Sequence, residues 1–156
     1  MSFITFTDYQ SFNTATDQLM QIDFENFLHK KTVDYYHHVT PFLIPNPLIL
    51  DGVTFTSPSC LFATHNAHIN NNMLFFEPNS KIYFPQSTKG VMLKLENTPN
   101  SIIKITNFSG ESISTQADGL DSCIFLGFIS QDGISSIEFV ESNTFVASVF
   151  FTSSIH

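Results

Sequence analysis

The chain of 156 residues contains no tryptophan and no arginine, and only 13% of its residues are charged. Its six basic residues, all lysine, stand against 14 acidic ones, which gives a net charge of −8. Without arginine the protein lacks the side chain that best makes bidentate contacts to phosphates, and its negative field repels polyanions. The composition therefore argues against nucleic-acid binding.

Long apolar runs are missing as well. No stretch approaches the roughly 18 residues of a membrane span, and the most apolar region, residues 42–50, is broken by Pro45, Asn46 and Pro47. Residues 1–6 carry no basic segment and no long apolar core, so no signal peptide is visible. We expect no membrane span, and either an intracellular protein or the mature part of an exported one.

Cysteine is scarce. Cys60 and Cys123 are far apart and show no CxxC spacing. A chain of this length buries roughly two thirds of its unfolded surface, so it needs neither a disulfide nor a metal to fold. We predict two reduced cysteines in the core, with a cross-strand disulfide as the alternative.

Strand-forming sequence, by contrast, is abundant, with 18 phenylalanines and 42% hydrophobic residues. The last quarter of the chain holds three apolar runs of strand length, cut by residues 131–133 and 141–143, a pattern typical of consecutive antiparallel strands. Residues 90–96 alternate between apolar and polar positions, as a strand with one buried face does. About eleven or twelve such short strands predict one all-β domain over residues 1–156, an antiparallel β-sandwich.

One helix is expected near the start of the chain. Asp8 is a suitable N-cap for residues 9–19, in which Phe12, Ala15 and Leu19 share one face. The sequence therefore predicts a short helix packed on the edge of the sheet.

Residues 26–51 are the least regular part of the sequence. Pro41, Pro45 and Pro47 exclude a helix or a central strand there. A connection of this length in a compact domain is usually functional or partly mobile.

The chain places its segments in a particular order: residues 6–19, 22–25, 52–55, 90–95 and 127–139, and then a strand that starts at Phe145. This order resembles the jelly-roll domain of bacterial exosortase-sorted (PEP-CTERM) proteins. The resemblance implies a fold similar to carbohydrate-binding and galactose-binding sandwiches, an exported location and no generally established activity. It also implies a cation held between an early acidic strand and an Asp in the last strand, where this chain carries Ser148.

Asp23 and Glu25 form the early acidic strand. They lie on one face of residues 20–25 if Ile22 and Phe24 are buried. Ca²⁺ takes six to eight oxygen ligands, which two carboxylates, backbone carbonyls and water begin to supply. The alternatives are a solvated strand face, a Ca²⁺ site, or a catalytic carboxylate pair, which would need a cleft around it.

Tyr35, Tyr36, His37 and His38 follow one another in the proline-rich connection. Aromatic rings with polar tips stack on sugar rings, while amides and imidazoles take hydroxyl groups. Residues 66–72 contain four asparagines, and Asn66 and Asn70 are predicted to supply such amides from a neighbouring loop. Loops 32–50 and 64–72 thus form a candidate carbohydrate surface, with ordinary loop packing as the alternative.

His65 and His68, together with His37 and His38, offer imidazoles for a transition metal. No HExxH motif or cysteine-rich partner accompanies them, and polar loop histidines are the simpler interpretation.

Three hypotheses follow. The first is a non-catalytic binding module for a glycan or another small polar ligand. The second is a self-assembling structural protein, because its many phenylalanines and few charges favour an apolar interface. The third is a metal-dependent enzyme.

Overall fold

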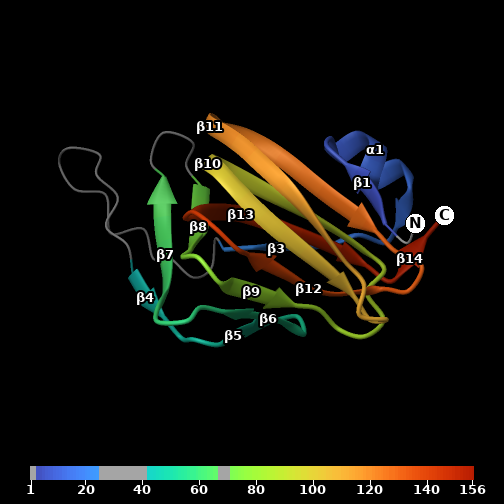
Figure 1. Cartoon of the computed structure of the whole chain (residues 1–156), viewed down its shortest axis with the longest axis horizontal. Helices are drawn as coiled ribbons and strands as arrows, with labels where there is room; N and C mark the ends of the chain where they lie inside the picture. The colour runs from blue at the N-terminus through green and yellow to red at the C-terminus, as the bar shows by residue number, and fades with distance from the viewer. Residues whose placement is uncertain (1–2, 25–41, 67–70) are drawn as a thin grey trace.

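The structure is a computed structural model that describes residues 3–24, 42–66 and 71–156 (Figure 1). Antiparallel strands make up most of it, and the one helix of this part of the chain is short. The helix is α1 (Tyr9–Thr14), and the strands are β1 (Ile4–Phe6), β2 (Thr16–Asp17), β3 (Met20–Asp23), β4 (Phe42–Ile44), β5 (Leu48–Leu50), β6 (Val53–Thr56), β7 (Leu61–Asn66), β8 (Asn71–Phe76), β9 (Ser80–Tyr83), β10 (Gly90–Asn107), β11 (Ser112–Ile129), β12 (Ile134–Phe139), β13 (Thr144–Thr152) and β14 (Ser154–Ile155).

Twelve strands form one hydrogen-bonded sheet that folds over into two layers. The fold line crosses β10, whose first half pairs with β13 and whose second half pairs with β12. Layer A holds β1, β3, β4, β7, β8 and β13, and layer B holds β5, β6, β9 and β12, while β10 and β11 run through both. The predicted class, an all-β, jelly-roll-like sandwich with one short helix, is confirmed.

Strand β10 continues to Asn107, well beyond residues 90–96, for which the sequence predicts a strand. The pairing with β11 shifts register between Glu96 and Thr98 and again between Thr98 and Ser101. Such bulges bend a strand and let residues drop out of the ladder. Pro99, which lacks an N–H donor, falls inside the second shift, so the proline and the continuous strand are compatible.

A column of phenylalanine rings fills the space between the layers. Phe24 and Phe76 come from layer A, and Phe55 and Phe139 come from layer B; all four are fully buried. Phe24 meets Phe55 edge-on with 5.8 Å between ring centroids, whereas Phe76 stacks on Phe139 at 4.9 Å. Aromatic pairs in these geometries stabilise a core beyond their buried area, which accounts for the use of phenylalanine here.

Helix α1 packs on the outer face of layer A, not on the sheet edge as the sequence suggests. Phe12 is buried against Met92, Ile129 and Phe150, which alternate along their strands with residues of the main core. Gly127 permits this close approach, because a Cβ there would lie 3.0 Å from Phe12 Cδ2 on the helix. The helix therefore closes a second, smaller core.

The helix is also shorter than the predicted residues 9–19. Asp8 is its N-cap and accepts a hydrogen bond from Ser11 N–H at 2.8 Å, as expected. The helix ends at Thr14, where β-branched residues follow: Thr16 Oγ1 donates to the Phe12 carbonyl at 2.9 Å, and β2 then pairs with β14. Side-chain bonds of this kind compete with helix continuation.

Candidate functional site

Asp23 occupies the outward face of β3, between the buried Ile22 and Phe24, so the predicted alternation is confirmed. Its partner in register on β13 is Ser148, and the partner of Ser148 on β10 is Lys94. Glu25 lies outside the described residues. Among the residues that the structure places, no three His, Cys, Asp or Glu side chains come together to hold a metal ion.

The predicted aromatic site, Tyr35, Tyr36, His37 and His38, lies outside the described residues, as do His68 and Asn70. Segment 64–72 was expected to be a loop, but its described residues, 64–66 and 71–72, belong to the paired strands β7 and β8. Asn66 ends β7 and pairs with Asn71 of β8, and His65 pairs with Asn72. Residues 61–63 and 73–76 are apolar, as residues of a strand often are. The two strands extend beyond them into the polar residues 64–66 and 71–72, because β7 and β8 pair with each other there.

Asn72 has a structural role. Its side chain is 3% exposed, and its Nδ2 donates to the Phe24 carbonyl at 3.2 Å. The bond ties β8 to the end of β3 at the base of the phenylalanine column.

Neither cysteine lies in the core, contrary to the prediction. Both are free; Cys60 is half-buried in the connection between β6 and β7, and Cys123 is exposed on β11. An apolar run follows each cysteine in sequence, but Cys60 falls between two strands and Cys123 is exposed on its strand.

A hollow of about 230 Å³ that the sequence did not suggest lies at one corner of the sandwich. Three distant segments form it: the turn between β2 and β3, the connection between β9 and β10, and the end of β13. Its lining residues are Gln18, Met20, Pro85, Ser87, Thr88, Phe151, Thr152 and Ser153. We call this feature the corner hollow.

The lining of the corner hollow is polar but uncharged. Gln18, Ser87 and Ser153 are exposed and offer an amide and two hydroxyl groups, whereas Thr88, Phe151 and Thr152 are buried behind them. Met20 and Pro85 supply apolar surface. Met20 is 48% exposed and therefore available to a ligand. A ligand that fits this lining has hydroxyl or amide groups on one side and C–H groups on the other, and carries no net charge.

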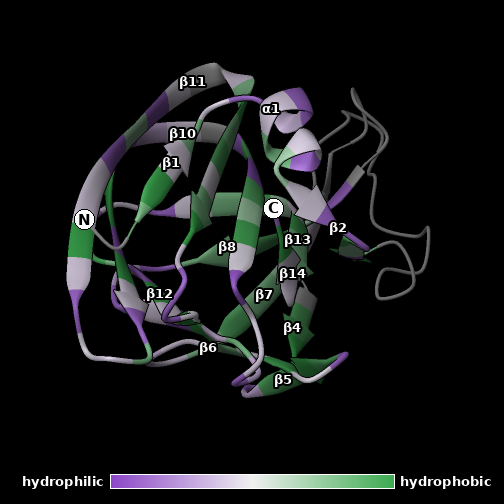
Figure 2. Cartoon of the chain, turned by 90° about the vertical axis from the view of Figure 1, so that its right-hand side faces the viewer, coloured by the Kyte–Doolittle hydropathy of each residue, from purple (hydrophilic) through white to green (hydrophobic). Residues whose placement is uncertain are grey.

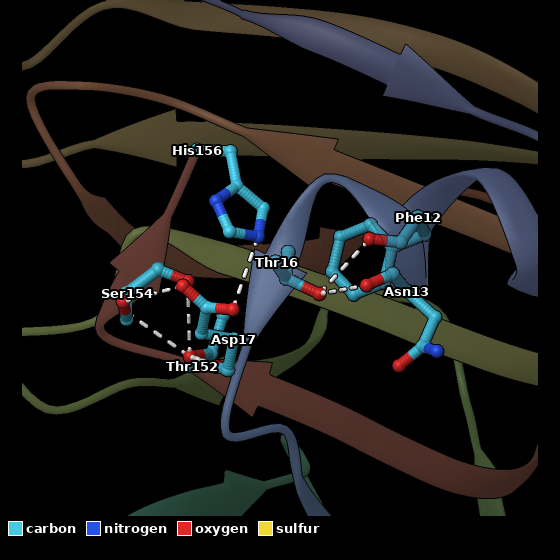
Figure 3. A network of polar contacts seen from close by, with 7 residues as sticks. All are labelled: Phe12, Asn13, Thr16, Asp17, Thr152, Ser154 and His156. Carbon is cyan, nitrogen blue, oxygen red and sulfur yellow. Dashed lines mark hydrogen bonds and ion pairs between the residues drawn. The ribbon is translucent and has the colours of Figure 1, made fainter.

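A network of polar contacts holds one wall of the hollow in place (Figure 3). Thr152 Oγ1 donates to the Asp17 carbonyl and accepts from Ser154 N–H at 3.0 Å. The Asp17 carboxylate receives Ser154 Oγ at 3.4 Å on one oxygen and lies 3.0 Å from His156 Nε2 on the other. Because β14 pairs with β2 at the same place, Thr152 and the turn at Gln18 are fixed relative to each other.

Gln18 itself has a left-handed backbone, with φ of 51°. A residue with a Cβ reaches this region only at a cost of roughly 1 kcal/mol. Strain of this kind persists where the surrounding structure imposes it. Here the left-handed turn at Gln18 sets the direction in which β3 begins, along the hollow. No local sequence signal marks this turn, since it contains neither glycine nor asparagine.

No helix in the described ranges is long and apolar enough to cross a membrane. The chain matches no protein-family model, and no curated protein matches its sequence.

Proposed function

We propose that this protein is a non-catalytic binding module that takes a small, neutral, polar ligand, such as a sugar unit of a glycan, in the corner hollow. The observation that carries the proposal is the lining: hydroxyl groups and one amide beside exposed apolar surface, with no charged side chain among the lining residues. Saccharides have this same division between hydroxyl edges and C–H faces. The hollow holds about one small ring, which is the size expected for the terminal unit of a longer glycan.

The rigidity of the corner supports binding of this kind. Besides the network around Thr152, backbone hydrogen bonds fix the opposite wall: Thr88 N–H donates to Pro85 O at 3.0 Å, and Ile134 N–H donates to Thr88 O at 2.8 Å. A preformed site loses less conformational entropy when it binds a ligand. Weak individual hydrogen bonds to hydroxyl groups then suffice for measurable affinity.

A glycan array that includes neutral and sialylated members tests the proposal. We expect neutral glycans to bind, and we expect Gln18→Ala and Ser87→Ala each to weaken that binding about three- to tenfold through the loss of one hydrogen bond. Gln131→Ala is the matched control, because Gln131 is exposed in the turn between β11 and β12. An array without hits, or equal loss in the control variant, would contradict the proposal.

The same array locates the site. Tyr35→Ala and Tyr36→Ala remove the aromatic rings on which the sequence-based prediction rests. If these two variants lose binding while Gln18→Ala keeps it, the ligand binds at loop 32–50 and the corner hollow is not the site.

A second candidate function, self-assembly, is favoured by an apolar patch on the outer face of layer B. Ile49 and Tyr83 are 63% and 44% exposed and flank Thr54 in one row across β5, β6 and β9. Such residues on an open sheet face favour contact with another apolar surface. We expect a concentration-dependent increase in mass that Ile49→Lys abolishes; a constant monomeric mass up to millimolar concentration would contradict assembly.

A further inference from the structure

Strand β11 has a long open edge. Its 18 residues pair with β10 on one side, but on the other side β1 covers only Gly127–Ile129. The chain then leaves the edge at Thr7, because Asp8 caps α1. From Ser112 to Leu126 this side of β11 has no strand partner in the part of the chain that is described, and Figure 2 shows β11 curving along the rim of the molecule with β10 beneath it.

A hollow of about 310 Å³ begins where β1 leaves this edge. Thr7 lines one end of it, and β11 residues 116–118 and 123–126 line the rest. Ile113 and Ile124 pack against the main core but are only partly buried. A further strand laid along the edge would bury these side chains and satisfy the open backbone groups of β11.

Most of this edge lacks the features that usually block strand addition, and the exception is the bulge where the pairing with β10 shifts register between Gly119 and Cys123. Edge strands are commonly protected by lysine or proline, and the short strands β4 and β5 lie beside Pro45 and Pro47. Residues 112–126 contain neither lysine nor proline. Residues 112–117 lie outside this bulge and pair regularly with β10, so they offer a further strand an open edge of average strand length.

The charges on the edge determine which kind of strand it can bind. Asp118 is exposed and lines the hollow, and the whole chain carries a net charge of −8. On the adjacent β10, Glu96 lies opposite Cys123 and Lys94 lies opposite Phe125. The negative charge of Glu96 and the positive charge of Lys94 cancel. A second copy brings its own net charge of −8, and an antiparallel pairing of two such edges about Asp118 would place the two Asp118 side chains opposite each other, where like charges are destabilising. A basic strand meets no such repulsion.

We infer that the open edge of β11 binds an extended, basic peptide segment as an added antiparallel strand that continues the line of β1. The backbone of β11 supplies most of the affinity, and Asp118 supplies the preference for lysine or arginine in the guest. This surface is separate from the corner hollow, so the inference does not depend on the proposed glycan site.

The test uses a labelled peptide of seven residues in which lysine and valine alternate, added to the full chain. We expect binding by fluorescence anisotropy, together with slower amide hydrogen exchange within residues 112–126. A peptide with glutamate in place of lysine, and a peptide N-methylated at every second residue, should both bind at least tenfold more weakly. The first removes the charge match, and the second removes the strand hydrogen bonds.

Asp118→Lys should weaken binding of the lysine peptide about fivefold at low salt, as expected for reversing one exposed charge. Asp132→Lys, in the exposed turn between β11 and β12, changes the net charge equally and should leave the affinity within twofold. Equal weakening in both variants, an unchanged exchange pattern in residues 112–126, or protection of those residues by dimerisation without peptide would each overturn the inference.

Discussion

Asn46 makes two reciprocal hydrogen bonds with the backbone of Ser57. Its Nδ2 donates to the Ser57 carbonyl at 2.8 Å, and Ser57 N–H donates to Asn46 Oδ1 at 3.0 Å. Asn46 lies between β4 and β5, and Ser57 lies between β6 and β7, so each residue belongs to a connection that crosses from one layer to the other. The pair fastens together the two ends of the folded sheet.

Asn46→Ala should lower the free energy of unfolding by about 1–2 kcal/mol, because two backbone groups of Ser57 lose their protein partner and turn to water. Asn46→Asp keeps the acceptor and loses the donor, so its effect should be smaller. Urea unfolding monitored by circular dichroism measures the change. Asn143→Ala, at an exposed position before β13, is the control, and equal destabilisation by both alanine variants would show that the pair adds nothing.

Glu77 extends this contact to a third crossing connection, between β8 and β9. Its Oε1 accepts from Ser59 Oγ at 2.6 Å, Ser57 Oγ at 2.7 Å and Ser59 N–H at 2.8 Å. The hydrogen bonds from Ser59, and then those from Ser57, hold the pKa of the carboxyl below its usual value. The ionised form is therefore the one that the fold favours.

A carboxyl whose pKa is lower in the folded state contributes stability above its unfolded pKa and loses it as the pH falls through the folded pKa. We therefore expect the wild type to lose stability below about pH 4.5, and Glu77→Gln to flatten this part of the profile. Chemical unfolding across pH 3–7 measures it. Glu141→Gln serves as the control at an exposed turn; a Glu77→Gln profile parallel to the wild type would refute the assignment.

The sequence predicted those strands that can be identified from the alternation of neighbouring residues alone. Residues 90–96 form the first part of β10 as predicted, and the alternation through Ile22, Asp23 and Phe24 places Asp23 outward. It did not predict the continuity of β10, because Pro99 and Asn100 have the composition of a turn, and only the pairing with β11 shows that they lie within a bulge.

The corner hollow could not be predicted for a similar reason. Gln18, Ser87 and Ser153 are far apart in the chain and come together only through the pairing of β2 with β14 and of β3 with β13. The backbone at Gln18 gives no sequence signal, since glutamine is not a typical residue for a positive φ.

Cys123 should be an unreactive thiol despite its exposed position. Partial burial of its sulfur, and then the neighbouring Glu96 carboxylate, raise its pKa to about 11. Because the thiolate is the reactive form, roughly 0.1% of the thiol is ionised at pH 8. In a Cys60→Ser background, alkylation by iodoacetamide should accelerate up to about pH 11, and Glu96→Gln should shift this profile to lower pH. An identical profile in both proteins would exclude the influence of Glu96.

Gln18→Gly tests whether the strained backbone at Gln18 contributes to ligand binding. Glycine adopts φ of 51° without a Cβ penalty, so we expect the free energy of unfolding to rise by about 0.5–1 kcal/mol. Affinity for the neutral glycan should fall, because the amide that faces the ligand is lost. Asn79→Gly, with φ of 70° at a residue type that tolerates this region, should change stability less. If the Gln18→Gly protein is more stable and binds the glycan with unchanged affinity, the strained backbone at this turn has no role in binding, because its removal does not weaken the interaction with the ligand.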